Sequence, residues 1–251
     1  MKISIITATY NSADVLSEAL ESIRMQTYRN IEHILVDGNS RDGTHDLLRE
    51  YAESVDYSVR IISEDDKGVY DALNKGIRIS SGDVIGFLHS DDFWKDPQLL
   101  EKVASSFDSE DIKGCYGNVI FVSRQDVHKV VRKWNGGKFS KSRLLLGWMP
   151  PHPSVFLKRE VYGKYGLFDT NYSVSSDYEL LIRFLYKHGI NVKYVPSLNV
   201  YMRIGGRSTR NLQSFIRSFK EDYAILKRHN LPALPIALVK RLRKLGQFMI
   251  L

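Results

Sequence analysis

Cysteine is almost absent from this sequence, and long apolar runs are missing. One cysteine, Cys115, stands among 251 residues, which excludes an intramolecular disulfide and a cysteine metal cluster and favours a reducing compartment. No run reaches the roughly 20 apolar residues that span a bilayer. The start, Met1-Lys2 followed at once by Ile3-Ser4-Ile5-Ile6, lacks the features of a signal peptide. We therefore expect a folded cytoplasmic protein.

Glycine-rich phosphate-binding motifs are also missing. A dinucleotide fold carries Gly-x-Gly-x-x-Gly after its first strand, whereas Thr7–Ser12 occupies that place here and contains no glycine. No Gly-Lys-Ser/Thr phosphate loop occurs either. These absences argue against a dehydrogenase and a phosphate-loop enzyme. A nucleotidyltransferase stays open as an alternative nucleotide-binding enzyme.

Acidic residues are missing from the end of the chain. The balance of 36 basic against 29 acidic residues gives a net charge of +7, yet Lys227 to Leu251 contains no acid. Two interpretations are open: a basic helix that contacts anionic lipid through apolar neighbours, or a solvated tail that packs one face on the domain. The bases match no nucleic-acid-binding motif, so nucleic acid is not an expected partner. The residues concerned are the bases Lys227, Arg228, Lys240, Arg241, Arg243 and Lys244, and the apolar Leu242, Leu245, Phe248 and Met249.

The first hundred residues alternate between strand and helix signals. Short apolar runs predict strands at Lys2–Ala8, Ile31–Val36, Val59–Ser63 and Val84–Leu88. Helical periodicity predicts helices at Ala13–Gln26, around Asp46–Ser54 and at Tyr70–Ile79. Strand-helix-strand units of this length indicate an α/β fold with a mainly parallel central sheet and helices on both of its faces.

The second half of the sequence is less regular. It predicts strands at Gly114–Val122, Val130–Trp134 and Val192–Val195, and helices at Tyr178–Tyr186 and from Leu212 to Arg228. We expect a domain over residues 1–210 and a basic, helical C-terminal extension over residues 211–251.

Polar residues follow each of the first four predicted strands. The segments are Thr9-Tyr10-Asn11, Asp37-Gly38, Glu64-Asp65-Asp66-Lys67-Gly68 and Ser90-Asp91-Asp92. In a parallel sheet all four strand ends lie at one edge, which is where ligands of open α/β folds bind. This convergence predicts a binding site more strongly than any single motif.

The pair Asp91-Asp92 is the most informative of these segments. Two carboxylates at a strand end suit a divalent cation such as Mg²⁺ or Mn²⁺, which completes its coordination shell with substrate phosphates. The alternative is a turn or helix cap ahead of Asp96-Pro97.

Several of these segments together resemble the family 2 glycosyltransferases of the GT-A fold. The resemblance rests on Ile3–Asn11, Val36–Thr44 and Ser90-Asp91-Asp92, and it resumes at His152–Phe156, Asp169 and Ser176–Glu179. Such enzymes bind a nucleoside-diphosphate sugar at the carboxyl edge of the sheet. The resemblance therefore implies a GT-A sheet and a sugar-transfer reaction.

The resemblance also implies roles for residues of the first half. Asp91 and Asp92 match the metal-binding carboxylates, and the implied cofactor is Mn²⁺ or Mg²⁺. His89 stands two residues before Asp91 where the family usually has an acid, and we assign it no metal role. The implied nucleotide-binding residues are Thr7, Thr9, Tyr10, Asp37, Asp65, Lys67 and Asp91. For Asp37 and Asp65, a turn former and a solvated loop are the alternatives.

In the second half, Asp177 matches the catalytic base. It would take the proton from an acceptor hydroxyl, and a helix N-cap role is compatible with that task. Trp148 and His152 lie in a Pro-rich segment of the kind that binds acceptors, although Trp148 could equally be a packing residue. Arg203 and Arg207 flank a glycine loop that could meet the diphosphate as a lid.

The expected activity is an inverting, metal-dependent sugar transfer from a nucleoside-diphosphate donor, a UDP-sugar in our expectation. The acceptor would be a hydroxyl of a saccharide or of a polyprenyl-linked saccharide in the biosynthesis of a bacterial surface polysaccharide. With its basic tail, such an enzyme is expected in the cytoplasm, and peripheral contact with anionic lipid at the inner face of the plasma membrane is one of the two open interpretations of that tail.

Overall fold

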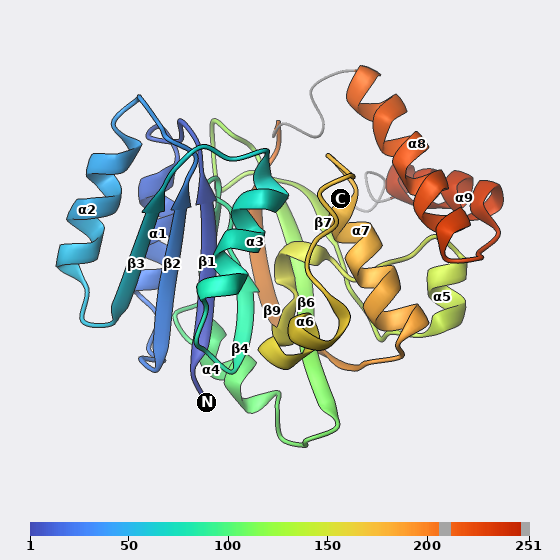
Figure 1. Cartoon of the computed structure of the whole chain (residues 1–251), viewed down its shortest axis with the longest axis horizontal. Helices are drawn as coiled ribbons and strands as arrows, with labels where there is room; N and C mark the ends of the chain where they lie inside the picture. The colour runs from blue at the N-terminus through green and yellow to red at the C-terminus, as the bar shows by residue number, and fades with distance from the viewer. Residues whose placement is uncertain (206–211, 247–251) are drawn as a thin grey trace.

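A nine-stranded mixed sheet forms the centre of the molecule (Figure 1). The computed structural model describes residues 1–205 and 212–246. The strand order is β3-β2-β1-β4-β8-β6-β9-β5, and β7 pairs with β6. The strands are β1 (Ile3–Thr9), β2 (Ile31–Asp37), β3 (Ser58–Ser63), β4 (Val84–Phe87), β5 (Asp92–Phe93), β6 (Ile112–Val122), β7 (Val130–Trp134), β8 (Phe156–Lys158) and β9 (Asn191–Arg203).

Helices cover both faces of this sheet. They are α1 (Leu16–Arg24), α2 (Thr44–Ser54), α3 (Val69–Ile79), α4 (Leu99–Ser105), α5 (Lys141–Leu145), α6 (Arg159–Tyr165), α7 (Ser176–Leu181), α8 (Leu212–Arg228) and α9 (Ala233–Gly246). A 3-10 turn, η1 (His152–Ser154), precedes β8, and a π-helix, η2 (Ile182–Lys187), continues α7. Within the described residues, no helix is long and apolar enough to cross a bilayer.

The parallel part of the sheet is the part that the sequence predicts best. β1 pairs in parallel with both β2 and β4, and β2 pairs in parallel with β3. Their carboxyl ends therefore lie at one edge, as expected. Beyond β4 the sheet is mixed, because β8 is antiparallel to both β4 and β6 while β9 is parallel to β6.

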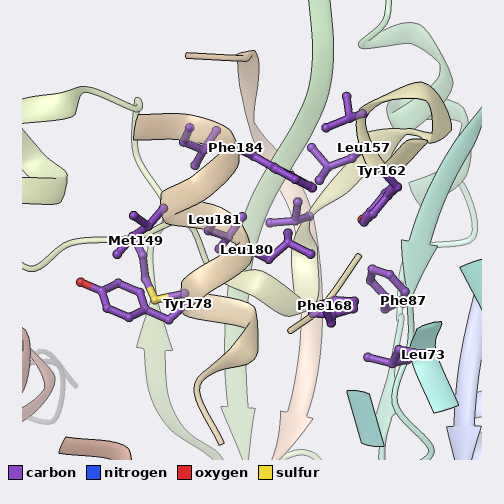
Figure 2. Packing of buried hydrophobic residues seen from close by; sticks show 14 of the residues in the cluster. Leu73, Phe87, Met149, Leu157, Tyr162, Phe168, Tyr178, Leu180, Leu181 and Phe184 are labelled. Atoms are coloured by element: carbon purple, nitrogen blue, oxygen red, sulfur yellow. The ribbon is translucent and has the colours of Figure 1, made fainter. Parts of the chain in front are cut away.

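Alternation along the strands builds a core on each face of the sheet. In β1, Ile5 packs with α1 and α4, whereas Ile6 packs on the other face with α3, as the two-residue period of a strand requires. The larger core joins α3, α6 and α7, and Figure 2 shows its apolar side chains between these helices and the strands.

The contact between β4 and β8 is short and close. It comprises three residue pairs, among them Gly86 with Phe156. The ring of Phe156 covers Gly86 so closely that a β-carbon there would lie 2.2 Å from the ring atom Cε1. This position therefore requires glycine.

The C-terminal helices α8 and α9 pack against α7 and the segment after α5 (Figure 1). Glu221 of α8 accepts hydrogen bonds from the backbone N–H groups of Ser173, Val174 and Ser175, just before α7. The backbone of α9 at Lys240 lies against Gly147. The predicted domain division after residue 210 falls among residues 206–211, outside the described residues, and stays a prediction.

Two predicted elements of the second half are wrong in extent. The strand predicted at Val192–Val195 runs from Asn191 to Arg203, because the alternating Leu198, Val200 and Met202 continue it beyond Pro196 and Ser197. The helix predicted at Tyr178–Tyr186 begins at Ser176, so Asp177 lies inside its first turn and Ser175 takes the N-cap position.

Candidate active site

Asp37, at the end of β2, is held rigidly by hydroxyl groups from neighbouring strands. Its buried carboxylate accepts hydrogen bonds from Thr9 Oγ1 at 3.0 Å, from Ser63 Oγ at 2.9 Å, and from Ser40. Burial raises the pKa of Asp37, but these hydrogen bonds outweigh it and hold the pKa below its ordinary value. The structure thus joins the predicted Thr9 and Asp37 in one anionic unit at the sheet edge.

Tyr10 and the loop after β3 surround Gly38. The Tyr10 side chain is 49% exposed. A β-carbon on Gly38 would lie 3.3 Å from the Tyr10 ring and 3.1 Å from a carboxylate oxygen of Asp66. The exposed Asp65 accepts a hydrogen bond from Asn39, and Lys67 is also exposed. These residues form one wall of the edge, and Asp66 is a member of it that the sequence interpretation did not single out.

Thr7 lies away from that edge. Its side chain is buried, and its hydroxyl lies 2.9 Å from His33 Nε2, beneath α2. The assignment of Thr7 to the nucleotide stays a prediction, and its contacts in this structure are those of a core residue.

Arg203, at the end of β9, fixes the turn that carries Asp91. Its buried guanidinium donates a hydrogen bond to the backbone carbonyl of Asp91 at 2.6 Å and pairs with Glu18 of α1. This arrangement leaves the Asp91 carboxylate, which is partly exposed, at the strand edge. Arg203 therefore contacts the Asp91-Asp92 segment itself. Its predicted contact with a diphosphate stays a prediction.

Asp92 is the most unusual carboxylate of the site. It is completely buried in β5, and neither of its oxygens has a protein hydrogen-bond donor. Burial raises the pKa of Asp92 well above its ordinary value, and the charge of Asp91 raises it further, against the opposing effect of Arg203. An unpaired buried carboxylate is costly, so Asp92 is suited to meet a proton or a cation.

The donor set fits a divalent cation that is shared with substrate. Among the described residues, no group of three or more His, Cys, Asp or Glu side chains could hold a metal ion. Mg²⁺ and Mn²⁺ need no such cage, because one or two carboxylates suffice when substrate phosphates supply further oxygens. Asp91 at the edge and the unpaired oxygens of Asp92 are consistent with this kind of site.

Asp177 and His152 form the second half of the site. His152 Nδ1 lies 2.9 Å from Asp177 Oδ2, and the Tyr70 hydroxyl of α3 donates to Asp177 Oδ1 at 3.1 Å. Burial raises the pKa of Asp177, but the charge of the adjacent His152, the charge of Lys240 and the backbone N–H of Tyr178 outweigh this effect, so the net pKa lies far below the ordinary value. Asp177 is therefore an oriented carboxylate that is ionised at neutral pH.

His89 links the two halves of the site. Burial lowers the pKa of this imidazole, while the charges of Asp91 and Asp177 raise it and that of His152 lowers it. The geometry agrees, because η1, which carries His152, packs against β4, and β4 leads directly into His89 and Asp91. Through the contact of His152 with Asp177, the fold brings Asp177 towards the end of β4 across 86 residues of sequence.

The structure does not place the predicted Trp148 and Arg207 among the groups around Asp177. Trp148 is 5% exposed, packs edge-on to Tyr116 and donates to the carbonyl of Gly136 at 2.9 Å, which are contacts of a packing residue. Arg207 lies outside the described residues. The sequence does not predict Lys240 of α9 as a site residue. Its ammonium lies 3.4 Å from the ring centroid of Tyr178, next to Asp177.

The fold and this arrangement of groups define a glycosyltransferase of the GT-A type. The sequence model described as Glycosyl transferase family 2 matches residues 4–166, and the chain belongs to that family. A glycosyltransferase of PGL/p-HBAD biosynthesis from Mycobacterium tuberculosis is 33% identical over 207 residues, which cover 82% of this chain and 78% of the relative. An uncharacterized glycosyltransferase from Nostoc sp. is 30% identical over 65% of this chain and 53% of its own length.

Solved structures show the same fold. A mannosyltransferase from Pyrobaculum calidifontis, in complex with GDP-Man and Mn²⁺, has a TM-score of 0.69 and 20% identity, covering 95% of this chain and 68% of its own. TarS of Staphylococcus aureus (residues 1–349), in complex with UDP-GlcNAc, has a TM-score of 0.70 and 18% identity, covering 90% and 64% respectively. The GT-A fold predicted from the sequence is confirmed.

Proposed function

We propose that this glycosyltransferase moves a sugar from a uridine diphosphate donor to a hydroxyl group of a saccharide acceptor, with inversion at the anomeric carbon. The observation that carries the proposal is the oriented, ionised carboxylate of Asp177 beside His152, close to the acids at the end of β4. The nucleotide-sugar complexes of the fold neighbours support the donor class.

The nucleotide would bind across the ends of β1, β2 and β3. Tyr10 offers an exposed ring on which a base can stack, and the fixed carboxylate of Asp37 can accept a hydrogen bond from the base. Thr9 orients that carboxylate, and Asp65 with Lys67 lines the loop beside it. Carboxylate recognition of ring N–H groups is directional, so this wall favours a base over a bare phosphate.

The proton of the acceptor would go to Asp177. Tyr70 and His152 each hold one of its oxygens, so the carboxylate is aimed before the substrate binds. As the acceptor oxygen forms its bond to the anomeric carbon, its proton passes to Asp177 and the bond to the diphosphate oxygen breaks. Attack from the face opposite the departing nucleotide inverts the centre in a single displacement.

Asp91 and Asp92 would hold a Mn²⁺ or Mg²⁺ ion, which neutralises the charge that grows on the departing diphosphate. Arg203 maintains the turn on which Asp91 lies. His152 is proposed to border the acceptor, whereas the expected roles of Arg203 and Arg207 at a closing loop stay predictions. The acceptor would be a saccharide on a polyprenyl carrier, used in surface polysaccharide assembly at the cytoplasmic face of the plasma membrane.

A donor panel tests this function. The purified chain is mixed with Mn²⁺ and each of several UDP-, GDP- and TDP-sugars, and release of the nucleoside diphosphate is measured with and without saccharide acceptors. We expect turnover with one UDP-sugar, and loss of turnover in Asp177→Asn with thermal stability retained. Full turnover in Asp177→Asn would contradict the assigned base, and turnover only with GDP- or TDP-sugars would contradict the donor.

A further inference from the structure

Exposed apolar side chains gather at one end of the molecule. Thirteen large apolar side chains are exposed among the described residues; six lie on α8 and α9, and two at the end of α5. Single exposed apolar residues are normal, but a gathered set indicates an interaction surface. The eight are Leu145, Leu146, Phe215, Ile216, Tyr223, Leu234, Leu238 and Leu242.

Three of them form a stripe along α9. Leu234, Leu238 and Leu242 recur every fourth residue, which places them on one face of the helix, and they are 52%, 49% and 66% exposed. The opposite face of α9 is the buried one, because Ile236 and Ala237 lie in the core. We call these three residues the leucine stripe. It faces outward, where a helix of a soluble domain normally carries polar residues.

The end of α5 lies beside α9. A β-carbon on Gly147 would lie 2.5 Å from the backbone nitrogen of Lys240, so the two segments are in direct contact (Figure 1). Leu146, next to Gly147, is 56% exposed. Exposed leucines therefore occur on both of the adjoining elements.

The exposed charges of this region are positive. The two acidic residues of α8 turn inward, because Asp222 is buried against Lys240 and Arg241, and Glu221 binds backbone N–H groups before α7; α9 has no acidic residue. No acidic residue occurs between Val127 and Arg159, the stretch that contains α5. Among the described side chains of α8 and α9, the exposed charged ones are all basic: Arg217, Lys220, Lys227, Arg228, which pairs with Asp169, and Arg243.

We propose that the leucine stripe, with Leu146, inserts into the interface of an anionic lipid membrane while the surrounding bases contact its headgroups. An amphipathic surface of leucines bordered by Lys and Arg binds a lipid surface by these two effects together. A second copy of the chain is a poor occupant, because self-association would bring two basic surfaces together.

This orientation brings the membrane close to the site. Lys240 lies two residues from both Leu238 and Leu242, on the opposite face of α9, and its ammonium contacts the ring of Tyr178 beside Asp177. An acceptor hydroxyl carried on a lipid of the same membrane would therefore need to rise by about the thickness of this helix, roughly 10 Å, to reach the base. This last step rests on the proposed function, whereas the docking does not.

Vesicle binding of the full chain tests the proposal. Sedimentation is measured with vesicles of phosphatidylcholine alone and of phosphatidylcholine mixed with phosphatidylglycerol. We expect binding to the mixed vesicles. In the double variant Leu238→Ser with Leu242→Ser, partitioning should fall at least roughly tenfold. In Arg243→Gln it should fall about fivefold.

Met25→Ser is the matched control, because Met25 is 60% exposed at the end of α1, outside the region; it should bind as the parent does. The proposal is overturned if the double variant binds vesicles like the parent, or if the parent sediments with neither vesicle. It is also overturned if the parent is a dimer that the double variant dissociates. Donor turnover with a soluble acceptor is measured in parallel, so that failure of docking and failure of the proposed function are separate results.

Discussion

At the scale of single residues, the site consists of acids in very different surroundings. Asp37 accepts hydrogen bonds from neighbouring hydroxyls, Asp177 is held by a histidine and a tyrosine, and Asp92 has no protein donor. The first two are stabilised as anions by the protein itself. Asp92 has no such donor among the described residues, and for this reason we assign the cation to its end of the site.

The pair of His152 and Asp177 predicts a change in pH dependence. Because the positive charge of His152 lowers the pKa of Asp177, the variant His152→Ala should raise that pKa. The base is then lost by protonation at a higher pH than in the parent. We expect the acidic limb of the kcat/KM profile for sugar transfer to move to higher pH. Steady-state kinetics from acidic to neutral pH measures it.

Tyr70→Phe is the control for that experiment. It removes the hydroxyl that contacts Asp177 and leaves His152 in place. The rate should fall, by roughly tenfold for one lost oriented hydrogen bond, while the acidic limb moves to higher pH by less than in His152→Ala, because a neutral donor is lost and not a charge. If the limb of His152→Ala coincides with that of the parent, His152 does not set the charge of the base.

At the scale of elements, the contact of Gly147 with α9 predicts how the C-terminal helices are held. Gly147 has a positive φ of 70°, and a β-carbon there would meet the backbone of Lys240. Gly147→Ala should therefore displace α9 and cost roughly 2 kcal/mol or more of local stability. Hydrogen exchange should show faster amide exchange in α9.

The matched variant is Gly163→Ala. Gly163 lies in α6, and a β-carbon there would have nothing within 4 Å. It should leave exchange in α9 as it is in the parent. Protection of α9 that is equal in Gly147→Ala and in the parent would show that this contact does not hold the helix.

The sequence predicts the first four strands and their helices well, because each carries a clear apolar period over a short length of chain. It fails for β5 and β8, which have two and three residues and are defined only by their partners. The same limit applies to the site. Asp37 and Asp177 were found by resemblance, but Tyr70 contacts Asp177 across 107 residues, and no local pattern carries such a contact.

Burial also separated residues that the sequence left equivalent. Asp91 and Asp92 are adjacent and identical in type, yet one is partly exposed in a turn and the other is completely buried in a strand. The sequence allows both an acceptor-binding and a packing role for Trp148, and its contacts with Tyr116 and Gly136 are those of packing. Such differences depend on the assembled sheet.

At the scale of the whole molecule, a buried histidine predicts acid sensitivity. His33 is completely buried between Thr7 and Tyr51, and burial lowers its pKa to about 3 from an ordinary value of 6.5. The folded protein therefore binds this proton less readily than the unfolded chain. The contribution of His33 to stability is complete above the unfolded pKa and is lost progressively as the pH falls from about 6.5 towards 3.

Replacing His33 should reduce that sensitivity. In His33→Gln, the free energy of unfolding, measured by urea denaturation, should fall less steeply with decreasing pH than in the parent. His128→Gln replaces an exposed histidine and should keep the slope of the parent. Equal slopes in the parent and in His33→Gln would show that this imidazole does not determine acid stability.

The short contact between β4 and β8 has a consequence for recombination among relatives of this enzyme. Gly86 comes from the half of the chain to which nucleotide binding is assigned, and Phe156, whose ring covers it, comes from the half that carries Asp177. A chimera that takes each half from a different parent folds only if both parents share this glycine–phenylalanine combination. The exchange of donor-binding and acceptor-binding halves is therefore constrained by an apolar pair that takes no part in the chemistry.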